Sequence, residues 1–198
     1  MCNTSNYVFY FYKRRLKVVT TFQKGEFFLN IIFHTTSAIA SGIVVSSVLD
    51  KKHSNKWHIK NRVLLFCVLI NVILHGALDL LPHSYPLRGK FDVILSLSIL
   101  IGIHIFIKSK YIFVFASCFF GSILPDIIDL GPAIVNKLNI VNLPVVKIFP
   151  WHWPQYSGSI FDNSNFYISF LNHLIVSSFF ILVIYIYRKY ILKSILRN

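Results

Sequence analysis

The chain has 198 residues, of which 55% are hydrophobic and only 14% are charged, and its mean hydropathy is +0.62. Because a water-soluble domain carries about 25% charged residues, this composition excludes an ordinary soluble fold and predicts an all-α polytopic membrane protein. The net charge of +13 does not indicate nucleic-acid binding, since the basic residues cluster beside apolar segments, where anionic lipid headgroups lie.

Five apolar segments are long enough, or nearly so, to cross a bilayer as helices, which takes about 20 residues. In chain order they are residues 27–49, 63–81, 91–107, 111–130 and 166–187. The stretch 7–22 is too charged to cross, so residues 1–26 are expected to form an amphipathic extension that lies along the membrane interface. Residues 27–198 are then predicted to be one domain, a transmembrane helical bundle of about five spans.

The connections between the segments also carry information. Only Lys108, Ser109 and Lys110 separate the third segment from the fourth, which predicts an antiparallel hairpin. Near the end of the fourth segment, Pro125 is expected to break the helix locally and to free backbone carbonyls. The longest loop, 131–165, has four prolines and few helix signals, and it is expected to fold back over one membrane face.

Most histidine and aspartate residues of the apolar segments fall at one predicted end of the bundle. Consecutive spans run in opposite directions, so nothing in the composition requires this. The residues at that end are His34 in the first segment, His75, Asp79 and His83 at the end of the second, Asp126 and Asp129 at the end of the fourth, His152 in the long loop, and His173 in the fifth. Only His104 of the third segment falls near the opposite end.

These residues are of the types that bind divalent metals. An acid at the centre of a membrane helix costs about 2.5–3.5 kcal/mol, and yet three of the seven acids of the chain lie at span ends within apolar sequence. Imidazole and carboxylate ligands suit Zn²⁺, Mn²⁺ or Fe²⁺. We predict a divalent metal site, Zn²⁺ first and Mn²⁺ or Fe²⁺ as alternatives, with the ligands His34, His75, Asp79 and Asp126.

The neighbouring polar residues have both functional and structural interpretations. Asp129 and His83 are predicted to act as a general base or to orient a ligand. Asp126 would alternatively cap a helix that restarts after Pro125. His152, between two tryptophans, is interpreted as an interface residue, and His173 as one that joins helices.

Three motifs resemble a family of small bacterial inner-membrane metal-dependent hydrolases that includes the LexA-regulated membrane hydrolase group. They are a histidine followed by small residues at 34–38, the sequence HGALDLLPH at 75–83, and the sequence GSILPD at 121–126. Zinc-dependent phospholipase C proteins carry a distantly similar pair of segments. The departures are the extension before the first motif, the sequence Ile-Ile-Asp after Asp126, and Ser-Tyr-Pro after His83.

The resemblance implies an integral protein of the bacterial inner membrane that hydrolyses a lipid-derived or phosphoester substrate at the interface, with membrane lipids as its partners. Two other classes stay open. A metal-ion or proton transporter also needs intramembrane Asp and His residues, but it should have polar residues that continue across the bilayer. A non-catalytic membrane scaffold would use the same residues only to join helices.

Overall fold

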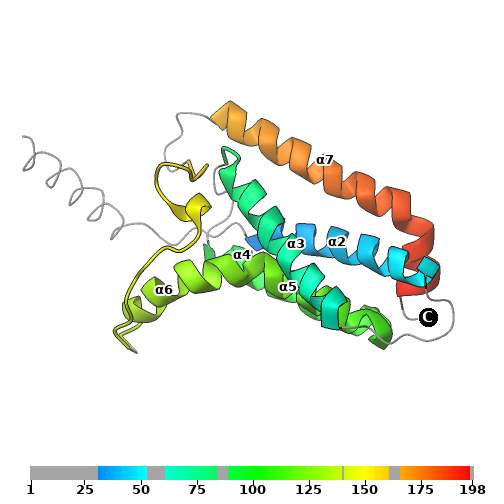
Figure 1. Ribbon diagram of the computed structural model, residues 1–198. Coiled ribbons are helices and arrows are strands. Elements are labelled where there is room, and N and C mark those ends of the chain that lie inside the picture. The colour runs from blue at the N-terminus through cyan, green and yellow to red at the C-terminus, as the bar shows by residue number, and fades with distance from the viewer. Residues whose placement is uncertain (1–30, 53–60, 84–88, 140, 161–165, 197–198) are drawn as a thin grey trace, which may run out of the picture.

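The computed structural model describes residues 31–52, 61–83, 89–139, 141–160 and 166–196, and these form an all-α bundle (Figure 1). The composition predicted this fold class, and the structure confirms it. The predicted interfacial extension and the first four residues of the first apolar segment lie outside the described residues.

The helices match the five predicted segments closely. In chain order they are α2 (Ile31–Lys52), α3 (Asn61–Leu80), α4 (Gly89–Phe106), α5 (Ser109–Asp129), α6 (Gly131–Lys137), the single 3₁₀ turn η1 (Pro150–His152), and α7 (Phe166–Tyr190), which continues as the π-helical turn η3 (Ile191–Ile195). The short helix α6 is an addition, because the long loop was expected to contain little helix.

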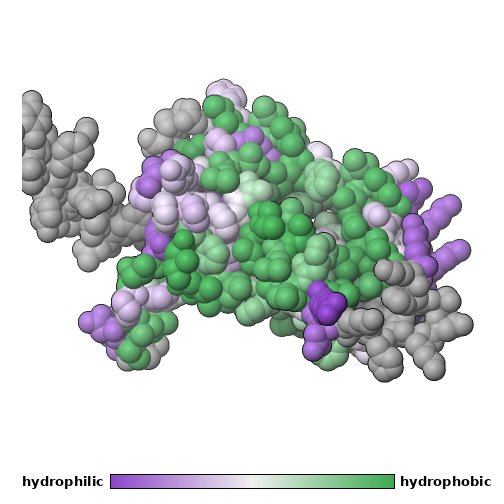
Figure 2. Space-filling model, in the orientation of Figure 1, coloured by the Kyte–Doolittle hydropathy of each residue, from purple (hydrophilic) through white to green (hydrophobic). Residues whose placement is uncertain are grey.

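Four of the described helices, α2, α3, α5 and α7, are long and apolar enough to cross a membrane. The apolar part of α4, Phe91–Phe106, is shorter and measures about 24 Å at 1.5 Å per residue, less than the ~30 Å of a hydrocarbon core. Figure 2 shows hydrophobic side chains over the middle of the molecule and hydrophilic ones toward its two ends. This distribution is compatible with a membrane protein.

Helix α2 lies at the centre of the bundle, where it packs against α3, α4, α5 and α7, while α5 packs against α3 and α2 (Figure 1). The α3–α5 contact is close because Gly121 has no side chain. A Cβ atom at this position would collide with the backbone of Val68 on α3. This close approach brings the ends of α3 and α5 together.

The prediction that Pro125 breaks the fourth helix is wrong, because α5 continues through this residue to Asp129. Proline removes only one donor, the N–H that would bond to the carbonyl of Gly121. The helical bonds resume at once, and Leu130 N–H donates to the carbonyl of Asp126 at 2.8 Å. One missing bond within a packed helix is therefore tolerated.

A buried carboxylate fixes the start of α2 at the end of the bundle where the polar residues gather. Asp92, in the first turn of α4, is 1% exposed. Its two oxygens accept hydrogen bonds from Ile31 N–H at 2.7 Å and Ile32 N–H at 3.1 Å. A negative charge is favourable at a helix N-terminus, so Asp92 caps α2 from a neighbouring helix and sets the position of the turn that carries His34.

At the opposite end, a second carboxylate joins three helices. Asp50, near the end of α2, accepts hydrogen bonds from Tyr111 Oη of α5 at 2.6 Å and Tyr190 Oη of α7 at 2.8 Å. It also forms an ion pair with Lys110 at 3.3 Å. These contacts hold α2, α5 and α7 in register along the bundle.

Candidate metal centre

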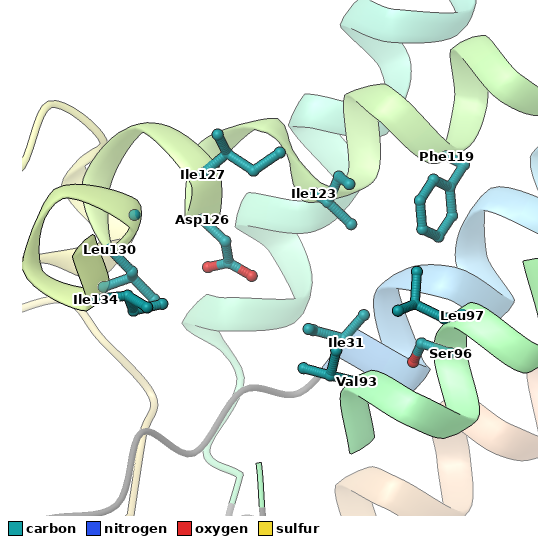
Figure 3. A pocket seen from close by; sticks show the side chains of 11 residues that line it. Ile31, Val93, Ser96, Leu97, Phe119, Ile123, Asp126, Ile127, Leu130 and Ile134 are labelled. Carbon is teal, nitrogen blue, oxygen red and sulfur yellow. The ribbon is translucent and has the colours of Figure 1, made fainter. Parts of the chain in front are cut away.

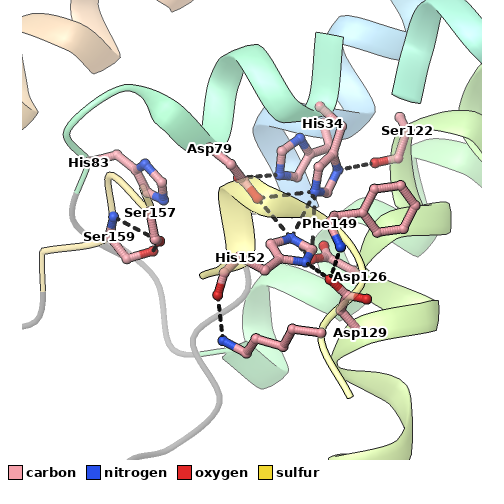
Figure 4. Close-up of polar contacts among 12 residues, drawn as sticks. His34, Asp79, His83, Ser122, Asp126, Asp129, Phe149, His152, Ser157 and Ser159 are labelled. Atoms are coloured by element: carbon pink, nitrogen blue, oxygen red, sulfur yellow. Dashed lines mark hydrogen bonds and ion pairs between the residues drawn. The ribbon is translucent and has the colours of Figure 1, made fainter. Parts of the chain in front are cut away.

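Four side chains from three elements converge at the end of the bundle that the sequence indicated (Figure 4). His75 and Asp79 lie four residues apart on α3, which puts them on one helix face. Asp126 comes from α5 and His152 from η1. Each offers one ligand atom, and the four atoms lie within 4.8 Å of one another.

The separations between these atoms fit a single ion. His75 Nε2 lies 3.1 Å from Asp79 Oδ2 and 3.7 Å from Asp126 Oδ1. His152 Nε2 lies 3.0 Å from Asp79 Oδ2, 3.3 Å from Asp126 Oδ1 and 3.3 Å from His75 Nε2. Tetrahedral ligands at ~2.0–2.2 Å from one ion lie about 3.3–3.6 Å apart. The group therefore has nearly the dimensions of a tetrahedral metal site.

Both imidazoles present the nitrogen that a metal requires. His75 Nδ1 lies 2.6 Å from the carbonyl oxygen of Ser122, and because a carbonyl only accepts, Nδ1 carries the proton. His152 Nδ1 donates in the same way to Asp129 Oδ2 at 2.9 Å. The two Nε2 atoms thus point into the group, while the other ring nitrogen of each is fixed, as is usual for metal-binding histidines.

Asp129 orients His152 and also holds the loop that carries it. Its carboxylate is fully buried and accepts hydrogen bonds from Ile148 N–H at 2.8 Å and Phe149 N–H at 2.9 Å, in addition to that from His152. With three donors on two oxygens, Asp129 is suited to positioning a ligand rather than to accepting a proton from water. Of its two predicted roles, general base and orienting group, the geometry supports the second.

The rest of the loop is fixed by backbone contacts and by one glycine. Lys147 Nζ donates to the carbonyl of His152 at 2.7 Å. The indole of Trp151 packs on Gly76 of α3, where an added Cβ would come within 2.6 Å of the ring. Gly158 N–H donates to the carbonyl of Asp79 at 2.8 Å. The long loop thus folds back over this end of the bundle, as its place in the sequence suggested.

His34, predicted as a metal ligand, lies beside the four-atom group rather than within it. Its Nε2 is 3.2 Å from Asp79 Oδ1, the carboxylate oxygen that does not face the other ligands. Its ring stacks on His75 with centroids 3.8 Å apart. His34 Nδ1 is buried and has no hydrogen-bond partner among the described residues. The contacts place His34 where it fixes the orientation of Asp79, and His152 Nε2 is the fourth atom of the group.

The two remaining histidines of this end are not brought into the group. His83, predicted as a catalytic residue, donates through Nδ1 to the carbonyl of Leu81 at 2.7 Å, and Figure 4 shows it apart from the cluster, beside Ser159. Burial lowers the pKa of its imidazole, so the ring is neutral at pH 7. His173 of α7 stacks on Phe33 with centroids 4.7 Å apart.

The charges of the group call for a cation. Two carboxylates and two imidazoles are largely withdrawn from water, and buried anions need a compensating charge. Burial by itself lowers the pKa of His152, but hydrogen bonds to Asp126 and Asp79 more than offset this and raise it to about 10. Without a metal, His152 therefore carries the compensating proton at neutral pH, and a divalent cation would replace that proton.

The sequence did not indicate His152 as a member of the metal site, because the flanking tryptophans are typical of an interface residue. The available signal was its place in the long loop, at the same end of the bundle as the acids. The same reasoning missed Asp92, whose two backbone contacts have no signature in the sequence.

Comparison of the chain with protein-family models, curated proteins and solved structures gave no match. The resemblance of the three motifs to membrane hydrolases therefore stays an expectation. What the chain does must be inferred from the geometry of the metal centre.

Proposed function

We propose that the chain is a membrane-embedded, metal-dependent hydrolase that cleaves a phosphoester at the membrane interface. In this proposal Zn²⁺ is held by His75, Asp79, Asp126 and His152, and Mn²⁺ or Fe²⁺ are alternatives. One observation carries it: four ligand atoms from α3, α5 and η1 lie within 4.8 Å of one another in a mostly buried group.

The arrangement of the ligands suggests the side from which a substrate approaches. Four protein ligands fill a tetrahedral zinc site, so water or substrate would have to bind as a fifth ligand or replace one of the four. Asp126 Oδ1 lies 3.7 Å from His75 Nε2, and Asp126 also lines a cavity. We infer that the substrate enters beside Asp126.

Each residue then has a distinct task. The metal would polarise a phosphoryl oxygen and lower the pKa of a water molecule toward neutrality. Ser122 and Asp129 bind Nδ1 of His75 and His152, so the inward Nε2 of each ring is the nitrogen that would give up its proton and bind the metal. His34 contacts the outer oxygen of Asp79, where it can share a proton with this carboxylate during turnover.

The test combines metal analysis with a hydrolysis assay on protein purified in detergent. The native chain is expected to hold about one metal ion and to release phosphate from a single-chain phosphoester such as lysophosphatidic acid. His152→Ala and Asp79→Ala are each expected to lose the metal and the activity. His104→Ala, which changes a histidine of α4 outside the cluster, serves as the matched control and should keep both.

Two results would contradict the proposal separately. Stoichiometric metal that survives both His152→Ala and Asp79→Ala would refute the metal centre. Metal that is lost in these variants, without hydrolysis of any phosphomonoester or phosphodiester lipid by the native chain, would leave the centre intact and refute the hydrolase.

A second candidate, metal-ion transport, has one specific observation in its favour. Buried polar side chains continue from the centre toward the middle of the bundle, where Ser41 Oγ donates to Asn71 Oδ1 at 2.9 Å and Asn71 Nδ2 donates to the carbonyl of Cys67 at 2.8 Å. Transport predicts uptake of Zn²⁺ into proteoliposomes that is abolished by Asn71→Leu. Hydrolase function predicts that this substitution leaves phosphate release unchanged.

A further inference from the structure

A cavity of about 270 Å³ lies between α4, α5 and α6, beside the first residue of α2 (Figure 3). Its walls are almost entirely aliphatic or aromatic, with Leu97 from α4, Ile123 from α5 and Ile134 from α6 as examples. The two polar side chains among its lining residues are Asp126 on α5 and Ser96 on α4. The cavity is therefore an apolar space with a metal ligand in its wall.

The position of Asp126 connects the cavity to the metal centre. Asp126 lines the cavity, and its Oδ1 lies 3.3 Å from His152 Nε2. A molecule whose chain occupies the cavity consequently has one end beside the four ligands. Long amphiphiles fit this description, whereas a compact hydrophilic phosphoester would leave the apolar walls without a partner.

The size and surroundings of the cavity fit one hydrocarbon chain. A cavity of about 270 Å³ has room for several methylene groups of one hydrocarbon chain. Leu97 and Ile127, at the cavity walls, are 48% and 51% exposed on an apolar surface. Transfer of an acyl chain from the bilayer to the cavity gains little hydrophobic free energy. The cavity would therefore distinguish lipids by the shape of their acyl chain and by the position of their head group relative to Asp126.

Ser96 provides an independent sign of a ligand. Its side chain is 1% exposed, and its Oγ has no hydrogen-bond partner among the described residues. A buried hydroxyl without a partner is unfavourable. Since Ser96 lies on the cavity wall, rotation of its side chain would bring this hydroxyl to an acceptor oxygen of a ligand in the cavity.

We propose that the cavity binds the acyl chain of a single-chain phospholipid, with the phosphate at the metal centre and the ester carbonyl accepting a hydrogen bond from Ser96. This inference rests on the proposed function, because it names the substrate class of the same centre. Chain length and the presence of an ester would then decide which phosphoester is bound.

The test uses lysophosphatidic acid with a diazirine at the middle of its acyl chain, bound to the full chain in bilayer nanodiscs with Zn²⁺ and then irradiated. Labelling is expected to concentrate on the cavity walls of α4 and α5, about tenfold above the lipid-facing surface of α7. Leu97→Trp fills the cavity and should remove this labelling. The matched control Ile101→Trp makes the same change of size one turn later on α4, outside the cavity, and should retain it.

A second variant tests the hydroxyl without changing the space. The native chain should bind the diazirine lysophosphatidic acid more tightly than an alkyl phosphate of equal length, which lacks the ester. Ser96→Ala should abolish this preference, which is expected to be about tenfold. Zinc content and gel-filtration profile report whether each variant is folded. Ser96→Ala therefore tests whether the lipid occupies the cavity even if Leu97→Trp misfolds.

Labelling spread evenly over all lipid-facing helices, or unchanged by Leu97→Trp in folded protein, would overturn the inference. If zinc binding depends on His152 and phosphate is released but the cavity is not labelled, the proposed function stands and the inference fails. If the cavity is labelled with the expected dependence on Leu97 and Ser96 while phosphate release is absent, the hydrolase fails and the binding site stands.

Discussion

Replacement of Asp129 by asparagine tests which of three roles Asp129 has. The residue could position His152, bind the metal directly, or only stabilise the fold. Asp129→Asn keeps the shape of the side chain and removes its charge. The native carboxylate accepts three hydrogen bonds, from His152 Nδ1 and from the N–H groups of Ile148 and Phe149, all at 2.8–2.9 Å. The variant retains one acceptor oxygen, and its amide presents donors where His152 also donates.

The size of the effect follows from these contacts. Hydrogen bonds to charged groups contribute about 1.5–3 kcal/mol and neutral ones about 0.5–1.5 kcal/mol, so neutralising Asp129 weakens each of its bonds by about 1 kcal/mol. Loss of a carboxylate that orients a metal-binding histidine lowers metal affinity ~10–100-fold. We therefore expect the Kd for Zn²⁺ to rise by this factor, while about one ion per chain still binds at saturation.

The assay is a zinc titration of detergent-solubilised protein in competition with a chromogenic chelator at pH 7. Asp92→Asn is the matched control, because Asp92 is equally buried and also accepts two backbone hydrogen bonds, but it contacts none of the four ligands. This control should lower the melting temperature and leave the Kd within about threefold of the native value. Equal loss of zinc affinity in both variants would refute a specific role for Asp129, as would an unchanged Kd in Asp129→Asn.

Three further outcomes are expected. Gly76→Ala places a methyl group 2.6 Å from the ring of Trp151. It should lower the free energy of unfolding by about 1–3 kcal/mol, measured by thermal unfolding, and weaken zinc binding. The control Gly102→Ala, with open space around it, should not destabilise the protein. The pKa of His152 is about 10 against an ordinary 6.5. The stability that the protonated ring gives the metal-free protein is therefore complete below pH 6.5 and lost toward pH 10. Zinc binding requires loss of that proton, so zinc affinity should rise between pH 6.5 and 10 in titrations at stepwise pH. Tyr190→Phe removes a 2.8 Å hydrogen bond to Asp50 at the opposite end of the bundle. It should lower the free energy of unfolding by about 1–3 kcal/mol and leave the zinc content unchanged. A change in zinc content would contradict the independence of the two ends.

The sequence predicted the helices and the end of the bundle where the polar residues meet. Apolar runs of about 20 residues predict membrane helices from length alone, and alternate helix direction then places His75, Asp79 and Asp126 at the same end. The i,i+4 spacing on α3 sets the relative position of two of the four ligands before any tertiary contact forms. These predictions depend on local periodicity and chain direction, which a single sequence contains.

The tertiary structure decided which residues complete the metal centre. His152 joins the group because Asp129 holds the loop through two backbone N–H groups and through the imidazole itself. Contacts of this kind join residues about 20 positions apart without any periodic pattern. They also move His34 to the outer oxygen of Asp79, 3.2 Å away. Side-chain composition and helix periodicity thus determined where a polar centre forms in this protein, and only the packing of an irregular loop against α3 and α5 determined which side chains complete it.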